Sequence, residues 1–216
     1  MHRTTNSGEN AIATLKTLAK KYPEKGMMDL GDPEDTLIAT LLSARTRDDQ
    51  VLKVYPSFRK KFPTLRDLAN ADVSAIASAI STIGMYKTKA KSLKKLAERV
   101  VNVYRGKIPD TMEDLTTLAG VGRKTASCEL WYAFGIPAVA VDTHVFRIAH
   151  RLKWTDKKDP EKVEEDLKNL LPEKWWGETN RIFVQFGRDI CRGPKPRCYL
   201  CPVAERCPFR PKTPRP

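Results

Sequence analysis

The sequence predicts an all-α protein with a metal-bound loop near its C-terminal end. Helix start signals recur along the 216 residues, and no alternating apolar and polar pattern of the kind that marks a strand persists. Four of the five cysteines lie together, between Cys191 and Cys207. With 41% hydrophobic residues, the chain has enough apolar surface to build a core and should be globular.

The first part of the chain contains four predicted helices. The first has apolar residues three or four positions apart, at Ile12, Leu15, Leu18 and Tyr22. Asp32 is expected to cap the second, with Pro33 at its first helical position. Thr46, which precedes a pair of acidic residues, is expected to cap the third, and Asp72 the fourth, "VSAIASAIS".

The middle of the chain continues the helical pattern. A longer amphipathic helix should stop at Gly106, and its apolar stripe consists of Ala90, Leu93, Ala97, Val100 and Tyr104. Asp110 should open a short helix that runs through Leu115. The stretch "RKTASCELWYAF", residues 123–134, is predicted to be helical and is apolar enough to be central.

Two more helices and a tail complete the predicted elements. One helix should begin near Thr143, and another at the pair Asp159 and Pro160, which repeats the capping signal seen earlier. The basic, proline-rich residues 209–216 are expected to be disordered.

The charge of the chain indicates a polyanionic partner. Lysine and arginine number 39 against 26 acidic residues, a net charge of +13, which favours nucleic acid, with solubility alone as the alternative. The basic residues are spread along the chain, which argues against a membrane surface. No apolar run approaches the ~20 residues of a membrane span, and the N-terminus lacks the apolar core of a signal peptide. We therefore expect a soluble cytoplasmic protein from a cell without organelles.

The segment "LAGVGRKTASCEL" predicts a tight hairpin between two helices. Glycine permits a left-handed backbone and a close approach of other atoms, so Gly120, Val121 and Gly122 can form a compact turn. The amides at the start of the second helix attract an anion. A DNA phosphate would fit there without any base contact, with Arg123 beside it. An ordinary turn between two helices is the alternative.

Lys124 and Asp142 are candidates for chemistry. Lys124 lies in the first turn of the second helix, whose positive end disfavours a further positive charge, and a neutral lysine amine can attack a carbon and form a Schiff base. A lysine that only assists phosphate binding is the alternative. Asp142 lies inside the apolar segment "AVAVDTHVF" and could be the carboxylate partner, the cap of the following helix, or both.

The four clustered cysteines have the spacing C-x6-C-x2-C-x5-C, at Cys191, Cys198, Cys201 and Cys207. Structural zinc sites pair two short knuckles, and only one such pair is present, so the spacing favours a [4Fe-4S] cluster over zinc. Cys128, in the central helix, is interpreted as a small buried core residue.

The stretch "LAGVGRKTASCELWYAFGIPAVAVDTHVFR" closely resembles the endonuclease III family of helix-hairpin-helix (HhH-GPD) DNA glycosylases. The resemblance runs from "DPEDTLIATLLSARTRD" to the last cysteine. It implies that Lys124 attacks the sugar C1′ and that Asp142 assists it. It also implies a [4Fe-4S] cluster on the four cysteines, in a loop at about residues 187–210 whose Arg192, Lys195 and Arg197 hold DNA phosphate.

The resemblance further implies how a base would be reached. Chemistry at C1′ requires the nucleotide to leave the stack, and an apolar side chain would fill the gap. Met85 stands where the family inserts a leucine, next to Ile83, although both could instead be core residues under a turn. Lys87 and Lys89 follow, placed for backbone contact.

Three more DNA contacts are expected. Arg45, beside Ser43, stands where relatives that act on oxidised pyrimidines carry glutamine. Arginine only donates hydrogen bonds and suits the acceptors of guanine, so Arg45 indicates either a lesion opposite guanine or a phosphate contact. His144 resembles a pocket-side histidine of the family, and a structural role at a helix start is the alternative.

The expected architecture is two α-helical lobes with the active cleft between them. Residues 26–136 would form a six-helix barrel with the hairpin and Lys124, and residues 1–25 with 137–216 would form the lobe with the cluster. The expected function is a monomeric base-excision-repair DNA glycosylase with AP lyase activity, which removes oxidised pyrimidines from duplex DNA of the nucleoid. The alternatives are a uracil or thymine glycosylase for mismatches opposite guanine, and a non-catalytic iron-sulfur DNA-binding protein.

Overall fold

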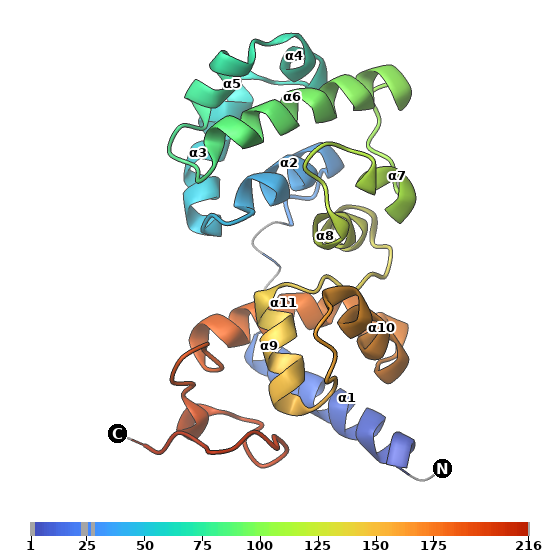
Figure 1. Cartoon of the computed structure of the whole chain (residues 1–216), viewed down its shortest axis with the longest axis vertical. Coiled ribbons are helices and arrows are strands. Elements are labelled where there is room, and N and C mark those ends of the chain that lie inside the picture. Colours follow the sequence, from blue (N-terminus) through green and yellow to red (C-terminus); the bar gives the residue numbers. More distant parts are fainter. Residues whose placement is uncertain (1–2, 23–25, 27–28, 216) are drawn as a thin grey trace. The chain divides into compact units, whose positions relative to one another are not determined.

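Residues 3–22, 26 and 29–215 are described by the structure, a computed structural model, and every regular element among them is helical (Figure 1). The prediction of an all-α fold is confirmed. The chain divides into two compact units: unit 1 is Met1–Lys25 with Pro137–Pro216, and unit 2 is Gly26–Ile136. None of the helices in the described residues is long and apolar enough to cross a membrane.

Unit 2 contains the helices α2 to α8. They are α2 (Pro33–Ser43), α3 (Asp48–Lys61), α4 (Leu65–Asn70), α5 (Val73–Ala79), α6 (Tyr86–Val103), α7 (Met112–Thr116) and α8 (Arg123–Phe134). The long helix α6 packs against α4 and α5, while α2 packs against α8 (Figure 1). Six consecutive residues of α8, 125–130, are buried, so this helix is central to its unit as predicted.

The helix starts of unit 2 follow the sequence signals with two shifts of one residue. Asp32 caps α2 as predicted and accepts a hydrogen bond from the amide of Asp35. The prediction that Thr46 caps α3 is wrong, because Arg47 holds that position and the Thr46 hydroxyl is used elsewhere. The short helix α7 is capped by Thr111 rather than opened by Asp110, because the Thr111 hydroxyl accepts from the amide of Asp114.

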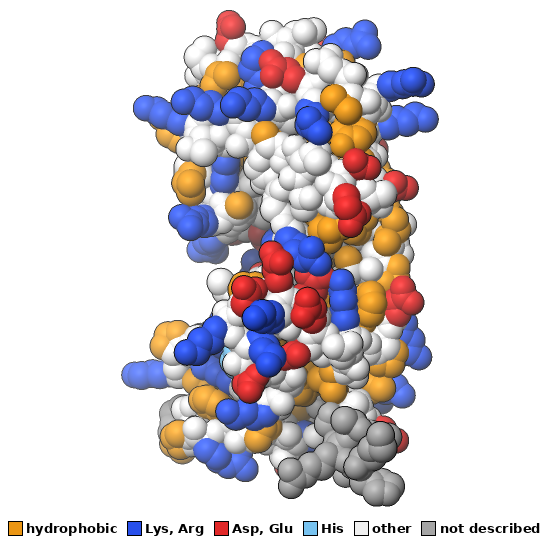
Figure 2. Space-filling view, turned by 45° about the vertical axis from the view of Figure 1, so that its right-hand side comes forward, with side chains coloured by type: hydrophobic (Ala, Val, Ile, Leu, Met, Phe, Trp, Pro, Cys, Tyr) orange, Lys and Arg blue, Asp and Glu red, His pale blue; other side chains and the backbone are white. Residues whose placement is uncertain are grey.

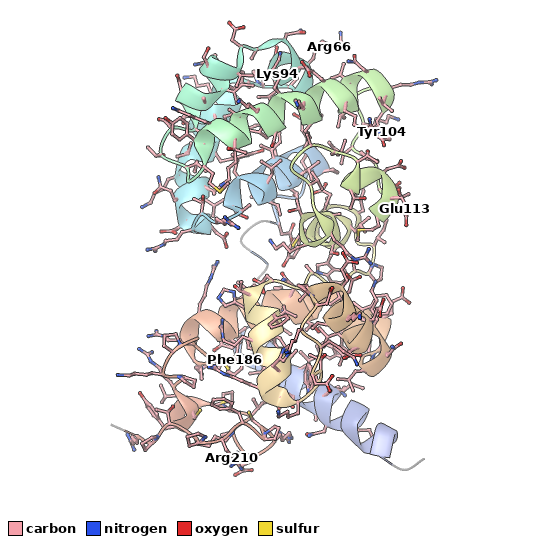
Figure 3. The ribbon with its side chains drawn as sticks, in the orientation of Figure 1. Arg66, Lys94, Tyr104, Glu113, Phe186 and Arg210 are labelled. Atoms are coloured by element: carbon pink, nitrogen blue, oxygen red, sulfur yellow. The ribbon has the colours of Figure 1, made fainter. Side chains whose placement is uncertain are left out.

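Unit 1 contains α1 (Arg3–Lys21), α9 (Thr143–Leu152), α10 (Pro160–Leu170), α11 (Trp176–Asp189) and two short 3-10 helices, η1 (Glu173–Trp175) and η2 (Cys198–Leu200). Helix α11, which the sequence analysis did not predict, packs against α9 and α1. Its buried Phe186 belongs to the core of the unit (Figure 3). The Tyr22 hydroxyl donates to Asp189 over 2.7 Å and thereby joins the end of α1 to the end of α11.

The acidic residues are unevenly distributed within unit 1. Figure 2 shows acidic and basic side chains intermingled on this unit, and α10 carries Glu161, Glu165 and Asp166 on a helix that also has Lys162, Lys168 and the buried Glu164. The cysteine loop after α11 is instead basic, with Arg192, Lys195 and Arg197. A polyanion would therefore be attracted to the cysteine loop.

Unit 2 buries one carboxyl group without a hydrogen-bond partner. Glu129 on α8 is 0% exposed, and neither of its carboxyl oxygens is hydrogen-bonded. Burial, with a smaller contribution from Asp32, raises the pKa of Glu129 to about 9. The carboxyl group of Glu129 therefore stays protonated in the folded chain at pH values where it is ionised in the unfolded chain. Its contribution to the free energy of unfolding falls as pH rises from 4.5 towards 9.

We predict that Glu129→Gln removes this pH dependence. Glutamine is neutral at every pH, so the free energy of unfolding should change little near pH 4.5 and rise by about 5 kcal/mol near pH 8, roughly 1.4 kcal/mol for each pH unit. Urea denaturation at the two pH values measures the difference. An equal effect at both values would show that Glu129 does not keep its proton in the fold.

Candidate active site and cysteine loop

The predicted hairpin joins α7 to α8 through residues 117–122. Gly120 has a left-handed backbone with a φ of +82°, and the Val121 amide donates to the Leu118 carbonyl over 3.0 Å. Gly122 is the N-cap of α8 and has no side chain to cap the helix. The first amides of α8 have no carbonyl one turn earlier to bond, as at every helix start, and they point towards an anion placed there.

The two glycines of the hairpin differ in what surrounds them. A Cβ at Gly120 would lie 2.9 Å from Cβ of Ser92 and 3.1 Å from Cδ1 of Leu41, so the turn packs directly on α6 and α2. A Cβ at Gly122 would meet nothing within 4 Å. Gly120 therefore serves the fold, and Gly122 faces open space at the helix start.

Lys124 lies in the first turn of α8, between the exposed Arg123 and the buried Thr125. It is half-buried, because the burial of α8 begins at the next residue. Val121, predicted as a DNA contact, is only 5% exposed, so only its backbone is available to a ligand. The helix start thus offers amides, one exposed guanidinium and one partly buried amine.

Asp142 is the N-cap of α9, and its carboxylate is held in a fixed position. Oδ1 accepts from the amides of His144 and Val145, over 2.9 and 2.8 Å. Oδ2 lies 3.1 Å from Nδ1 of His144. The capping role proposed from the sequence is confirmed, and His144 occupies the first turn of the same helix. A Cβ at Gly187 on α11 would lie 2.6 Å from Cδ2 of His144, so a residue without a side chain is needed there.

Two predicted DNA contacts of unit 2 have left-handed backbones. Arg45 has a φ of 54° and Met85 a φ of 60°, a conformation that side chains other than glycine rarely adopt. Both side chains are exposed, Met85 by 51%. Such strain persists where the surrounding structure imposes it and is typical of functional sites.

The other predicted contacts of unit 2 fall into two groups. Lys87 is exposed, and the half-buried Ser43 donates its hydroxyl to the carbonyl of Thr40. Ile83 is 1% exposed and Lys89 is 6% exposed, because Ile83 is a core residue and the Lys89 ammonium is hydrogen-bonded inside the unit. Neither side chain reaches the surface, so this arrangement does not support the DNA contacts predicted for them.

The cysteine loop follows α11 and places its four cysteines around one pocket. Cys191, Cys198, Cys201 and Cys207 line it together with apolar side chains that include Ile148, Phe186 and Val203. None of the five cysteines forms a disulfide, and Cys128 is a buried core residue as predicted. In the described part of the chain, no three His, Cys, Asp or Glu side chains are arranged so that they could bind one metal ion together.

Burial changes the acidity of the cysteine thiols. The pKa of Cys201 is raised to about 11, by burial and then by the neighbouring thiols of Cys191, Cys207 and Cys198. Burial also raises the pKa of Cys191, although Arg151 and Arg147 oppose this shift. The thiols are thus close enough to affect one another, and a cation would be required to keep several of them ionised.

Two arginines of α9 hold the cysteine loop, and the sequence analysis did not single them out. Arg151 donates to the carbonyls of Arg192 and Gly193, each over 2.6 Å, and to Sγ of Cys191 over 3.3 Å. Arg147 donates to the carbonyl of Cys191 over 3.1 Å. Their spacing of four residues places them on one face of a helix, but only the fold brings that face to the loop.

The basic residues of the loop are placed as follows. Arg192 and Lys195 are exposed, and Arg197 is half-buried. Lys195 has a left-handed backbone with a φ of 51°. Beyond Cys207, Arg210 donates to the Cys207 carbonyl over 3.0 Å, and the Arg151 guanidinium lies 4.8 Å from the ring centre of Phe209 (Figure 3).

Residues 38–173 match the family model described as HhH-GPD superfamily base excision DNA repair protein. The chain therefore belongs to this superfamily, which confirms the family that its motifs indicated. Endonuclease III of Thermotoga maritima is 41% identical over 194 residues, which is 90% of each chain, and endonuclease III of a Synechocystis species is 37% identical over 96% of each.

Solved structures give the same result. A structure of endonuclease III trapped as a covalent intermediate with DNA has a TM-score of 0.88 and 33% identity, and the match covers 93% of this chain and 95% of that one. A thermostable thymine-DNA glycosylase has a TM-score of 0.86 and 27% identity, with 95% and 97% coverage. Both branches weighed from the sequence thus have structural relatives of nearly equal shape.

We predict that alanine substitutions at the two hairpin glycines have different effects on stability. Gly120→Ala should lower the free energy of unfolding by about 1–3 kcal/mol, because it forces a left-handed alanine against Ser92. Gly122→Ala should leave stability nearly unchanged, because its Cβ meets no atom. Urea denaturation of both variants tests this, and equal losses would contradict the different roles given to the two glycines.

Proposed function

We propose that this protein is a base-excision-repair DNA glycosylase with AP lyase activity that removes oxidised pyrimidines from duplex DNA. The observation that carries this proposal is Lys124, a half-buried lysine in the first turn of α8 directly after the Gly120 hairpin. It belongs to a chain whose family is base excision repair and whose structural relatives include endonuclease III bound covalently to DNA.

Lys124 acts as the nucleophile. Its neutral amine attacks C1′ of the damaged nucleotide, the bond from C1′ to the base breaks, and the base leaves with the electron pair and takes up a proton. The amine then loses a proton and the sugar ring opens, which leaves an imine between Lys124 and C1′. A proton is removed from C2′ and the C3′–O bond breaks, so the strand is cut on the 3′ side of the lesion.

Asp142 supplies the negative charge for this reaction. Its carboxylate stabilises the positive charge that develops on the sugar as the base leaves. The two amides at Oδ1 and the His144 ring at Oδ2 fix its orientation, which supports a preorganised role. His144 is accordingly assigned to hold this carboxylate and to line the nucleotide pocket.

DNA is bound mainly through its phosphates. The open space at Gly122 and the first amides of α8 receive one phosphate, with Arg123 beside it. Met85 is assigned as the apolar wedge, and Arg45 as the contact to the orphaned base. The remaining phosphate contacts are assigned to Ser43, Lys87, Arg192, Lys195 and Arg197.

The cysteine loop is proposed to hold a [4Fe-4S] cluster. Four thiols around one apolar pocket fit a centre that binds thiolates, and the C-x6-C-x2-C-x5-C spacing favours iron-sulfur over zinc. Cys191, Cys198, Cys201 and Cys207 would be its ligands, and the cluster would stiffen a loop that has little regular structure.

A second candidate is a glycosylase for uracil or thymine opposite guanine. Arg45 favours it, because a donor-only side chain suits guanine, and the thymine-DNA glycosylase relative is similar in fold. The higher identity to endonuclease III favours the first candidate. We place the protein as a monomer on the chromosome in a prokaryotic cytoplasm, in keeping with its bacterial relatives.

The chemistry predicts a trapped covalent adduct. Borohydride should link the protein to a duplex with thymine glycol opposite adenine, and Lys124→Ala should abolish both the adduct and strand cleavage while DNA affinity is kept. Lys107→Ala, which removes an exposed lysine outside the site, is the control and should behave as the wild type. An adduct on uracil opposite guanine alone would favour the second candidate, and undiminished cleavage by Lys124→Ala would refute the assigned nucleophile.

The cofactor predicts a coloured protein. The purified protein should be brown, with broad visible absorption and bound iron, and Cys198→Ser should weaken both signals. Cys128→Ser is the matched control, because this cysteine belongs to α8 of unit 2 and is not one of the four clustered cysteines, and it should keep the colour. Bound zinc in a colourless protein would overturn the assignment.

A further inference from the structure

Lys89 is a buried lysine that the proposed chemistry does not use. It lies on α6, is 6% exposed, and its Nζ donates to the carbonyl of Leu42 over 2.7 Å and to the hydroxyl of Thr46 over 2.9 Å. Leu42 is in the last turn of α2, where carbonyls lack a helical partner and a positive charge is favoured. One ammonium group therefore joins α6, the end of α2 and the turn that follows it.

The turn held by Lys89 carries Arg45. Residues 44–47 connect α2 to α3, and the Thr46 hydroxyl that Lys89 binds belongs to the residue after the left-handed Arg45. Gly84 lies against the same turn, where a Cβ would approach the Arg45 carbonyl to 3.2 Å and Thr46 Oγ1 to 3.1 Å. Met85, also left-handed, directly follows Gly84.

The two left-handed residues thus stand on adjacent turns. A further bond supports the arrangement, because Nε2 of Gln50 on α3 donates to the Thr82 hydroxyl over 3.1 Å, close to the turn of Met85. Each turn contains a side chain assigned above to the extruded state, Met85 as the apolar wedge and Arg45 as the contact to the orphaned base. Neither turn has regular secondary structure, so their relative position depends on contacts of this kind.

Burying the Lys89 ammonium costs free energy, which argues that it is retained for the direction of its hydrogen bonds. An apolar side chain of similar length would fill the same space without losing hydration, whereas a buried ammonium must recover its lost hydration through hydrogen bonds. Burial lowers the pKa of Lys89 to about 8, in keeping with that cost. What the ammonium adds over an apolar residue is two directed bonds, one to the last turn of α2 and one to the α2–α3 connection.

We propose that Lys89 is a positioning residue that fixes the turn of Arg45 against the turn of Met85, so that both side chains enter the duplex together when the damaged nucleotide is extruded. This inference rests on the proposed function, in which Met85 is the wedge and Arg45 contacts the orphaned base. It assigns Lys89 to base extrusion and leaves the reaction at C1′ to Lys124.

Helix α6 offers a matched control. Lys94 lies on the same helix, and its Nζ donates to the carbonyls of Ala69 and Ala71, over 2.8 and 3.0 Å, at the end of α4 (Figure 3). Lys89→Met and Lys94→Met therefore remove the same kind of bond from the same helix. Only Lys89 is connected to the turns of Arg45 and Met85.

The test compares extrusion with chemistry. The first substrate is a duplex with thymine glycol opposite 2-aminopurine, whose fluorescence reports unstacking of the opposite base, with single-turnover excision measured in parallel. The second is a single strand with an abasic site, which needs no extrusion. Lys89→Met should lower the excision rate and the fluorescence response about tenfold or more, which corresponds to about 1.4 kcal/mol, and leave borohydride trapping on the single strand within about twofold. Lys94→Met should keep all three signals at the wild-type level.

Each outcome bears on a separate claim. If the wild type neither excises thymine glycol nor is trapped, the proposed function fails. If the wild type is active and Lys89→Met equals Lys94→Met, the positioning role fails while the function stands. If Lys89→Met does not fold, Thr46→Val and Thr46→Ser decide, because valine removes the bonded hydroxyl and serine restores it. Serine should then recover the fluorescence response that valine loses, and equal responses would overturn the proposal.

Discussion

The burial of α8 is the constraint on which unit 2 depends. Residues 125–130 are all buried. The hairpin before them packs on Ser92 and Leu41 at Gly120, whose left-handed backbone and close contacts favour glycine. The start of α8 is therefore immobilised by packing that extends well behind it. This places the Lys124 amine at the boundary between the core and the surface, where a lysine can be partly desolvated and still accessible.

The constraint in unit 1 is different, because its cysteine loop has almost no regular secondary structure to fix its conformation. Side chains replace the missing backbone pairing: Arg151 and Arg147 on α9 donate to carbonyls of the loop, and Lys212 donates to the Cys207 carbonyl over 2.7 Å. The same helix begins at Asp142. Helix α9 thus connects the proposed catalytic carboxylate at its start to the cysteine loop at its other end, within one rigid element.

Several helix caps and helix limits were predictable from the sequence because they depend on local interactions. The Asp32 cap, the limits of α8 and the Asp142 cap depend on residues close together in the chain, where capping and glycine rules apply directly. The errors came from competition over distance. Thr46 has a side chain that often caps helices, but its hydroxyl accepts a hydrogen bond from Lys89, 43 positions away. Lys89 itself looks like a surface lysine until the fold buries it, and Arg151 becomes important only when α9 meets the loop.

The double use of Asp142 affects how related sequences should be interpreted. Its carboxylate caps α9 through two amide bonds, a contribution of about 1 kcal/mol that any descendant would lose by substitution, whether or not it still cuts DNA. Natural selection for a folded chain alone is therefore enough to retain a helix-capping residue there, and aspartate meets that need. Among homologues, an aspartate at this position therefore does not by itself show that the activity has survived.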